Sequence, residues 1–125
     1  MIIMKNEPAR KYRCGKEQWI EITDCGSIEL MADEQVTFHT QSGAEYDLAA
    51  KSWGFYATPS LNGRLAGFGL HGVLVKNLAN RFFMMLVEEG KEKEFDEYLS
   101  AEELEIICWL DSDENLSRLE KAIKG

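Results

Sequence analysis

The stretch that decides the fold is residues 81–90, which read Arg-Phe-Phe-Met-Met-Leu-Val-Glu-Glu-Gly. Successive side chains of a strand point to opposite faces of the sheet, so the apolar run 82–86 gives a strand that is apolar on both faces. Strands of this kind occur where both faces of the sheet are covered. We therefore expect a layered domain. Helices would cover one face, and the N-terminal strands, the last helix or a second subunit would cover the other.

Strand and helix patterns alternate on either side of this stretch. Thr58 and Pro59 are typical of a helix start, as N-cap and first helical residue, and Gly67 and Gly69 are typical of the end of that helix. Apolar spacing predicts a second helix around residues 95–99. Strands are predicted over residues 53–57, 73–75, 81–87 and 104–110. The order over residues 52–110 is therefore β-α-β-β-α-β, which is the order of a ferredoxin-like unit.

The two ends of the chain give different patterns. Residues 1–17 are polar and basic and predict a flexible basic arm. Residues 18–50 alternate with a period near two, which predicts an antiparallel β meander. Ser112 can cap a C-terminal helix over residues 112–124. The predicted fold class is α+β, with one domain over residues 18–125.

Composition limits the classes of function. The chain has 125 residues, 45% of them hydrophobic, and a net charge of -8. Such an acidic chain is a poor nucleic-acid binder, because that binding depends on basic residues that neutralise phosphates. Its apolar runs are far shorter than the roughly 20 residues that span a bilayer, and its start is too short for a signal peptide. Three cysteines without metal-ligand spacing predict free thiols. We therefore expect a soluble cytoplasmic protein that binds neither nucleic acid nor membrane.

Charged residues are segregated along the chain. Residues 1–16 hold five basic residues and one acid, whereas residues 88–114 hold twelve acids and two lysines. Residues 48–87 contain no Asp or Glu but four basic residues. Burial of this apolar segment is one explanation, because buried strands exclude charges of both signs. A basic binding site is the other.

The predicted fold gives that basic site a location. In a sheet of this order, the first helix begins at the same end as the turn between the second and third strands. A helix N-terminus has unpaired N–H groups and a partial positive charge, which suit phosphate or carboxylate. The predicted anion-binding residues are Thr58, Ser60, Asn62, Arg64, Lys76, Asn77 and Arg81. The alternative is that Thr58 only caps the helix and that the basic side chains pair with the acids of residues 88–114.

Patterns that suggest catalysis or a cofactor lack the context they require. Residues 67–72 match a dinucleotide-binding glycine pattern, but they follow a predicted helix and lead into a strand, which is the reverse of the required order. His39 and His71 are the only histidines, too few for a metal site, so each is expected to be solvated or hydrogen-bonded. No serine or cysteine nucleophile motif is present. We therefore predict no catalytic residues, no metal and no cofactor.

These observations favour a non-enzymatic module that binds a small anionic ligand or a partner protein, and that forms a homo-oligomer such as a dimer. Two alternatives remain. One is an enzyme without a recognisable motif that acts on a phosphorylated or carboxylated metabolite, with Arg64 holding the anion. The other is a structural subunit whose apolar strands drive oligomerisation.

Overall fold

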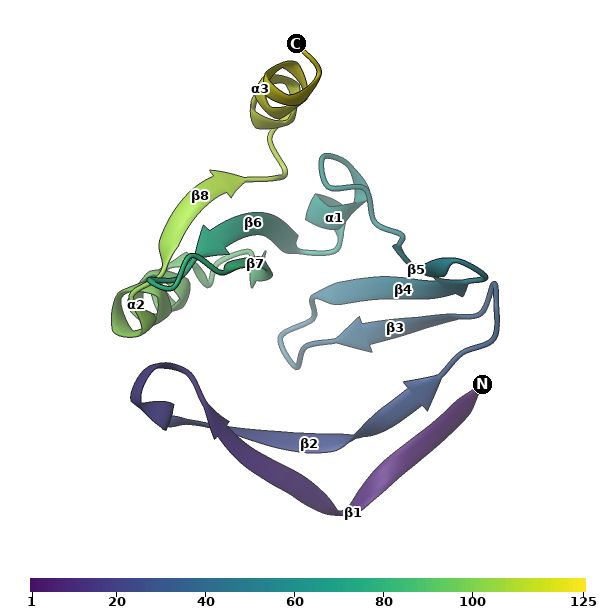
Figure 1. Ribbon diagram of the computed structural model, residues 1–125. Coiled ribbons are helices and arrows are strands. Elements are labelled where there is room, and N and C mark those ends of the chain that lie inside the picture. The colour runs from purple at the N-terminus through teal and green to yellow at the C-terminus, as the bar shows by residue number, and fades with distance from the viewer. The chain divides into compact units, whose positions relative to one another are not determined.

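Three β-sheets and three α-helices make up the structure, a computed structural model that describes all residues 1–125 (Figure 1). The α+β class predicted from the sequence is confirmed. In chain order the elements are β1 (Ile2–Cys14), the 3-10 helix η1 (Lys16–Gln18), β2 (Ile20–Glu29), β3 (Gln35–His39), β4 (Glu45–Lys51), β5 (Gly54–Ala57), α1 (Arg64–Gly67), β6 (Leu70–Lys76), β7 (Phe82–Glu88), α2 (Glu92–Glu102), β8 (Glu105–Trp109) and α3 (Asp113–Lys124). The strand orders in the sheets are β1-β2, β3-β4-β5 and β7-β6-β8.

The chain divides into two compact units. The first comprises residues 1–36 and 48–56, and the second comprises residues 37–47 and 57–125. The single domain over residues 18–125 stays a prediction.

The second unit is organised around β6, which pairs antiparallel with β7 on one edge and with β8 on the other. Val73 and Val75 are fully buried on one face of β6, where they form a core cluster with Val87 and Leu99 of α2. On the opposite face, Leu70 packs with Leu65 and Ala44 in a second cluster. Helix α2 therefore covers one face of the sheet, as the sequence predicted for a helix.

The ferredoxin-like arrangement is not confirmed. That fold requires the strand of residues 54–57 in the same sheet as the other three, but β5 belongs to the β3-β4-β5 sheet. Only Ser52 and Trp53 separate β4 from β5, and a two-residue connection favours a hairpin between consecutive strands. The element order was predicted correctly, but this local pairing determines a different topology.

The first predicted helix is also shorter than expected. It begins at Arg64, with Gly63 at the N-cap position and no side-chain cap, so Thr58 is not the N-cap. The Ser60 hydroxyl accepts a hydrogen bond from the Arg64 backbone N–H at 2.9 Å, and the Ser60 carbonyl accepts from Leu65. Serine side chains that bond nearby backbone groups favour turns over helix, which explains why residues 58–63 stay non-helical.

The N-terminal region forms a long hairpin. In place of the flexible arm expected over residues 1–17, Ile2–Cys14 form β1, which pairs antiparallel with β2. Strand β2 also joins two short strands of the predicted meander into one, whereas β3 and β4 lie where the meander placed them. The prediction for residues 1–17 rested on their polarity. A two-stranded hairpin tolerates polar residues because most of its side chains remain exposed, as they do here.

The C-terminal helix agrees with its prediction. Ser112 is the N-cap of α3, and its hydroxyl accepts a hydrogen bond from the Asn115 backbone N–H at 3.1 Å. None of the helices combines the length and the apolar character that a membrane span requires.

Replacing Gly26 by alanine should destabilise the β1–β2 hairpin. A Cβ at this position would lie 2.1 Å from the Met4 carbonyl oxygen, and the φ of 151° disfavours an L side chain. Backbone strain at such a φ lowers the free energy of unfolding by about 1–3 kcal/mol. The steric clash with the Met4 carbonyl oxygen would lower it further. Gly54→Ala is the matched control, because Gly54 has a similar φ of 143° and open space around it. Urea unfolding should show a larger loss for Gly26→Ala; equal losses in the two variants would contradict the close approach.

Candidate functional site

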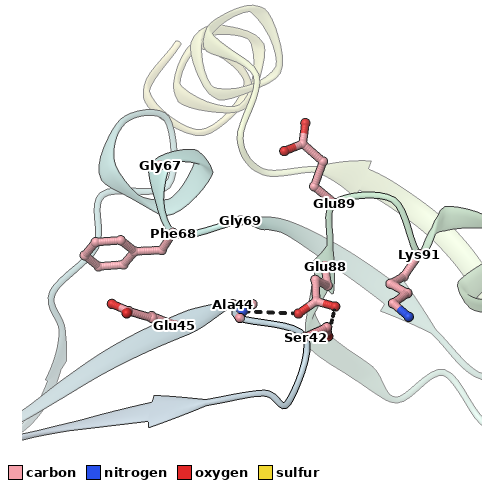
Figure 2. A pocket seen from close by; sticks show the side chains of 10 residues that line it. Ser42, Ala44, Glu45, Gly67, Phe68, Gly69, Glu88, Glu89 and Lys91 are labelled. Carbon is pink, nitrogen blue, oxygen red and sulfur yellow. Dashed lines mark hydrogen bonds between the residues drawn. The ribbon is translucent and has the colours of Figure 1, made fainter.

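A pocket of about 440 Å³ lies within the second unit, between the β3–β4 turn, the connection from α1 to β6 and the end of β7. Figure 2 shows its lining, with Phe68 on one side and Glu88 beside the turn. Its charged lining residues are Glu45, Glu88, Glu89 and Lys91. Lys91 also pairs with Glu94 at 3.7 Å. The pocket is therefore predominantly acidic, and it would repel an anionic ligand.

Glu88 is held by the β3–β4 turn. Its carboxylate accepts hydrogen bonds from the Ser42 hydroxyl and from the Ala44 backbone N–H at 3.3 Å, as Figure 2 shows. It also accepts one from the Thr40 hydroxyl at 2.5 Å. The Ser42 hydrogen bond is the largest of the causes that lower the pKa of Glu88, followed by that of Thr40. These contacts engage both carboxylate oxygens. The Glu88 side chain therefore links the end of β7 to the β3–β4 turn through hydrogen bonds.

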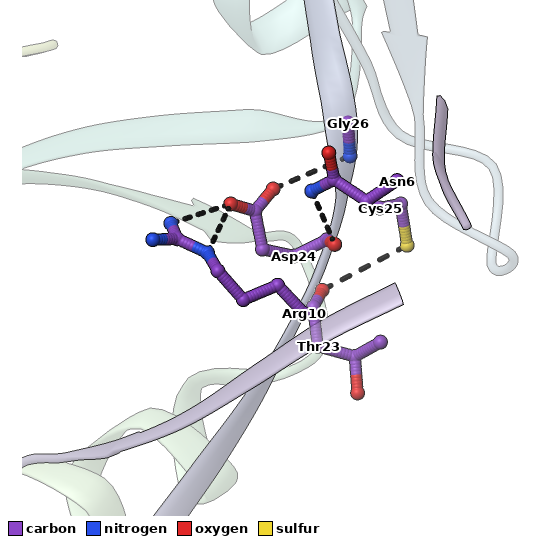
Figure 3. Close-up of polar contacts among 6 residues, drawn as sticks. All are labelled: Asn6, Arg10, Thr23, Asp24, Cys25 and Gly26. Atoms are coloured by element: carbon purple, nitrogen blue, oxygen red, sulfur yellow. Dashed lines mark hydrogen bonds and ion pairs between the residues drawn. The ribbon is translucent and has the colours of Figure 1, made fainter. Parts of the chain in front are cut away.

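A separate polar cluster lies in the β1–β2 hairpin, where the register shifts between Lys5 and Arg10 (Figure 3). Asp24 accepts two hydrogen bonds from the Arg10 guanidinium, at 2.6 and 3.2 Å, and one from the Gly26 backbone N–H at 3.3 Å. The Arg10 hydrogen bond is the main cause that lowers the pKa of Asp24. Asn6 donates to the Asp24 carbonyl. The polar groups of the cluster form their hydrogen bonds with one another, so the cluster stabilises the irregular part of the hairpin.

Two of the three basic residues predicted to bind an anion, Arg64 and Lys76, already have acidic partners. Arg64 forms an ion pair with Asp47 at 3.5 Å, and its guanidinium lies 5.1 Å from the centre of the Phe68 ring. Asp47 is only 7% exposed, and a buried carboxylate requires such a partner. Lys76 pairs with Glu105 of β8 at 3.7 Å. This outcome resembles the alternative in which the bases pair with acids, although only Glu105 belongs to residues 88–114.

The remaining predicted residues have local roles. Asn62 donates to Asp113 at 2.8 Å, and Ser60 bonds the start of α1. Asn77 accepts hydrogen bonds from the backbone N–H groups of Ala79 and Arg81, which closes the β6–β7 turn. The Thr58 hydroxyl is buried and has no hydrogen-bond partner.

The structure places the two predicted groups toward different ends of β6. The side chains of Leu61 and Leu65 pack against Gly72, near the beginning of this strand. Lys76 is four residues further on, at the end of the strand, which corresponds to roughly 13 Å at about 3.3 Å per residue. Leu61 and Leu65 thus lie beside the beginning of β6, whereas the β6–β7 turn follows its end. The anion site over these residues stays a prediction.

One polar pair was not predicted. His71 Nδ1 lies 2.5 Å from Asp111 Oδ2, and both side chains are partly buried. The pairing of Val73 with Trp109 across β6 and β8 places residues 71 and 111 opposite each other just beyond the ladder. Their separation of 40 residues gave no local signal in the sequence. The carboxylate orients the imidazole ring, but the structure shows no hydrogen bond from Nε2 to a hydroxyl or thiol that could act as a nucleophile.

The start of β7 is one of several exposed apolar parts of the chain, which also include residues 1–4 and residues 53–56. Phe82, Phe83 and Met84 are 57%, 45% and 53% exposed, although the sequence predicted that both faces of this strand would be covered. The second half of the strand is covered, since Val87 lies in the core cluster. The first half of β7 therefore offers consecutive large apolar side chains to a partner.

Replacing Glu88 by glutamine should remove a pH-dependent contribution to stability. Because folding lowers the pKa of Glu88 below its usual value of 4.5, its contribution is complete above that pH and is lost as the pH falls through the folded value. The difference in unfolding free energy between wild type and Glu88→Gln should therefore be constant near neutral pH and shrink in acid. Urea unfolding of both proteins, from neutral pH to below pH 4.5, measures this difference in unfolding free energy. Glu89→Gln is the control, and the same pH dependence in that variant would contradict the role of Glu88.

Comparisons of the chain with protein-family models, with curated proteins and with solved structures found no match. The choice among candidate functions therefore depends on the geometry of the chain itself.

Proposed function

We propose that this chain is a non-enzymatic assembly module that binds a partner protein through β7. The observation that carries the proposal is the exposure of three consecutive large apolar residues, Phe82, Phe83 and Met84, at the edge of a sheet. Monomeric proteins rarely leave such residues clustered in water, and clustered exposed apolar residues mark interaction sites. Aromatic residues and methionine are also enriched in protein–protein interfaces.

The ion pairs weigh against the anionic-ligand alternative. Arg64 compensates the buried charge of Asp47, and Lys76 is paired with Glu105. An anion would have to compete with these carboxylates for the same basic side chains. The helix N-terminus that was expected to bind the anion near Thr58 is also absent, because α1 is a single turn that begins at Arg64.

The enzyme alternative has its best support in the His71–Asp111 pair. An imidazole oriented by a carboxylate is suited to act as a general base. The hydrogen bonds of the structure join this imidazole to Asp111 alone, so the pair supports a link between β6 and the segment after β8 better than it supports a reaction. We place the module in the cytoplasm, where free thiols such as those of Cys14, Cys25 and Cys108 persist.

A photocrosslinking amino acid at position 82 should capture one defined protein when the full chain is expressed in cells. The same amino acid at position 97, on the exposed surface of α2, is the matched control. Mass spectrometry of the adducts should show one recurrent protein, another chain or a second copy, from position 82 only. The proposal fails if both positions give the same unspecific adducts or none.

Thermal unfolding with phosphate, nucleotides and carboxylates should show no stabilisation of the wild-type chain. A specific ligand at a hundred times its dissociation constant would add about 2.7 kcal/mol, which is readily measured as a shift in Tm. A shift seen in wild type and lost in Arg64→Ala would overturn this expectation. It would restore the anion site at Thr58, Ser60, Asn62, Arg64, Lys76, Asn77 and Arg81.

A further inference from the structure

The free edge of β7 has a defined hydrogen-bonding pattern. Beyond the two ends of the β6–β7 ladder, the Arg81 carbonyl accepts from Asn77, and the Glu89 N–H donates to Gly69. Both pairs keep the register in which Leu70 lies opposite Glu88 and Lys76 opposite Phe82. In an antiparallel ladder, alternate residues direct their backbone groups to the same neighbour. The odd-numbered residues of β7 therefore bond β6, and Phe82, Met84 and Leu86 direct their N–H and C=O groups away from the sheet.

This edge lacks the features that usually protect an edge strand. Residues 82–87 contain no charged residue, no proline and no glycine. Inward charges, prolines and bulges are the common means of blocking an edge. The other edge strand, β8, has such protection, because its register with β6 shifts between Leu74 and Val75 and it begins with Glu105. Of the two edge strands of this sheet, only β7 presents a regular and entirely apolar edge to another strand.

The charges that flank β7 are complementary to those of a second β7. Arg81 precedes the apolar run, and Glu88 and Glu89 end it. A two-fold axis perpendicular to the sheet, midway between the Met85 residues of the two copies, would pair the strands antiparallel. Each Arg81 would lie opposite Glu89 of the other copy, and each Met84 opposite Leu86. Met84 and Leu86 are outward-bonding residues, so this register also satisfies the hydrogen-bond pattern. A parallel pair would instead place like charges side by side.

In the same two-fold arrangement, the exposed Phe83 side chain of each copy would lie near a groove of the other copy. Phe83 would lie opposite Val87 of the second copy, on the face covered by α2. On that face, a groove of about 350 Å³ runs between β7 and α2, and its apolar lining includes Met85, Val87, Phe95 and Tyr98. Side chains directly opposite each other in an antiparallel pair have Cβ atoms about 5 Å apart, so each Phe83 would reach the groove of the other copy.

We infer that the partner of β7 is a second copy of this chain, joined edge to edge as an antiparallel β7–β7 pair centred on Met85. The inference rests on the proposed function, because it names the protein that the apolar strand binds. The two three-stranded sheets become one continuous sheet. Each contact occurs twice, as a two-fold axis requires.

Sedimentation velocity of the full chain over a wide range of concentrations tests the inference. We expect a concentration-dependent species of twice the 14.3 kDa chain mass. Arg81→Glu and Glu89→Arg should each raise the dissociation constant by about tenfold, because each places like charges opposite each other at two equivalent positions. The double variant Arg81→Glu/Glu89→Arg should restore the dimer, which a merely damaged fold could not do.

Met84→Pro supplies an independent test of the hydrogen-bond pattern. Proline removes an N–H that points away from β6, so the β6–β7 ladder should persist while the dimer is lost. Met84→Thr keeps the N–H and is the matched control. Circular dichroism verifies the fold of each variant.

The outcomes separate this inference from the proposed function. A dimer that neither the charge reversals nor Met84→Pro weakens would overturn the β7–β7 pair. A chain that stays monomeric at every concentration would overturn it as well. In either case the proposed function survives if the crosslinker at position 82 captures a different protein, and it fails if that position captures none.

Discussion

The pairing of β6 with strands on both of its edges is the constraint on which the second unit depends. One edge fixes the register of β7 and the other that of β8, so residues far apart in the sequence become neighbours. The double pairing places His71 beside Asp111 and Lys76 beside Glu105. It also divides the core, since alternate side chains of β6 enter the cluster under α2 or the cluster around Leu65. Because β6 occupies the centre, β7 necessarily lies at an edge.

The sequence predicted the elements of this unit better than their connections. The apolar run of β7, the helical stripe of α2 and the Ser112 cap of α3 are local signals, and each led to the correct kind of element. The topology was missed because the pairing of β5 is decided by a two-residue connection to β4. Polarity was misleading over residues 1–17, because a strand in a two-stranded hairpin does not need to bury its side chains.

The candidate site could likewise be predicted only in part from the sequence. The scarcity of acids over residues 48–87 was a real feature of the sequence, but the partners of Arg64 and Lys76 lie outside this segment, at Asp47 and Glu105. Long-range pairing of this kind cannot be deduced from one sequence, because it depends on strand register. The exposure of Phe82, Phe83 and Met84 was likewise hidden, since an apolar strand in a sequence does not reveal which half of it is covered. The apolar character of the strand also suggested a second subunit over it, and that suggestion stays a prediction.

The irregular register of β8 has a consequence for the size of the assembly. A sheet with two regular free edges can add further copies without limit and grow into a fibre. Here only one edge is regular, because the shift between Leu74 and Val75 disrupts the spacing of hydrogen-bonding groups along β8. Once two copies are joined through β7, both outer edges of the shared sheet are β8 strands. Growth of this sheet through its edges therefore stops at a closed pair.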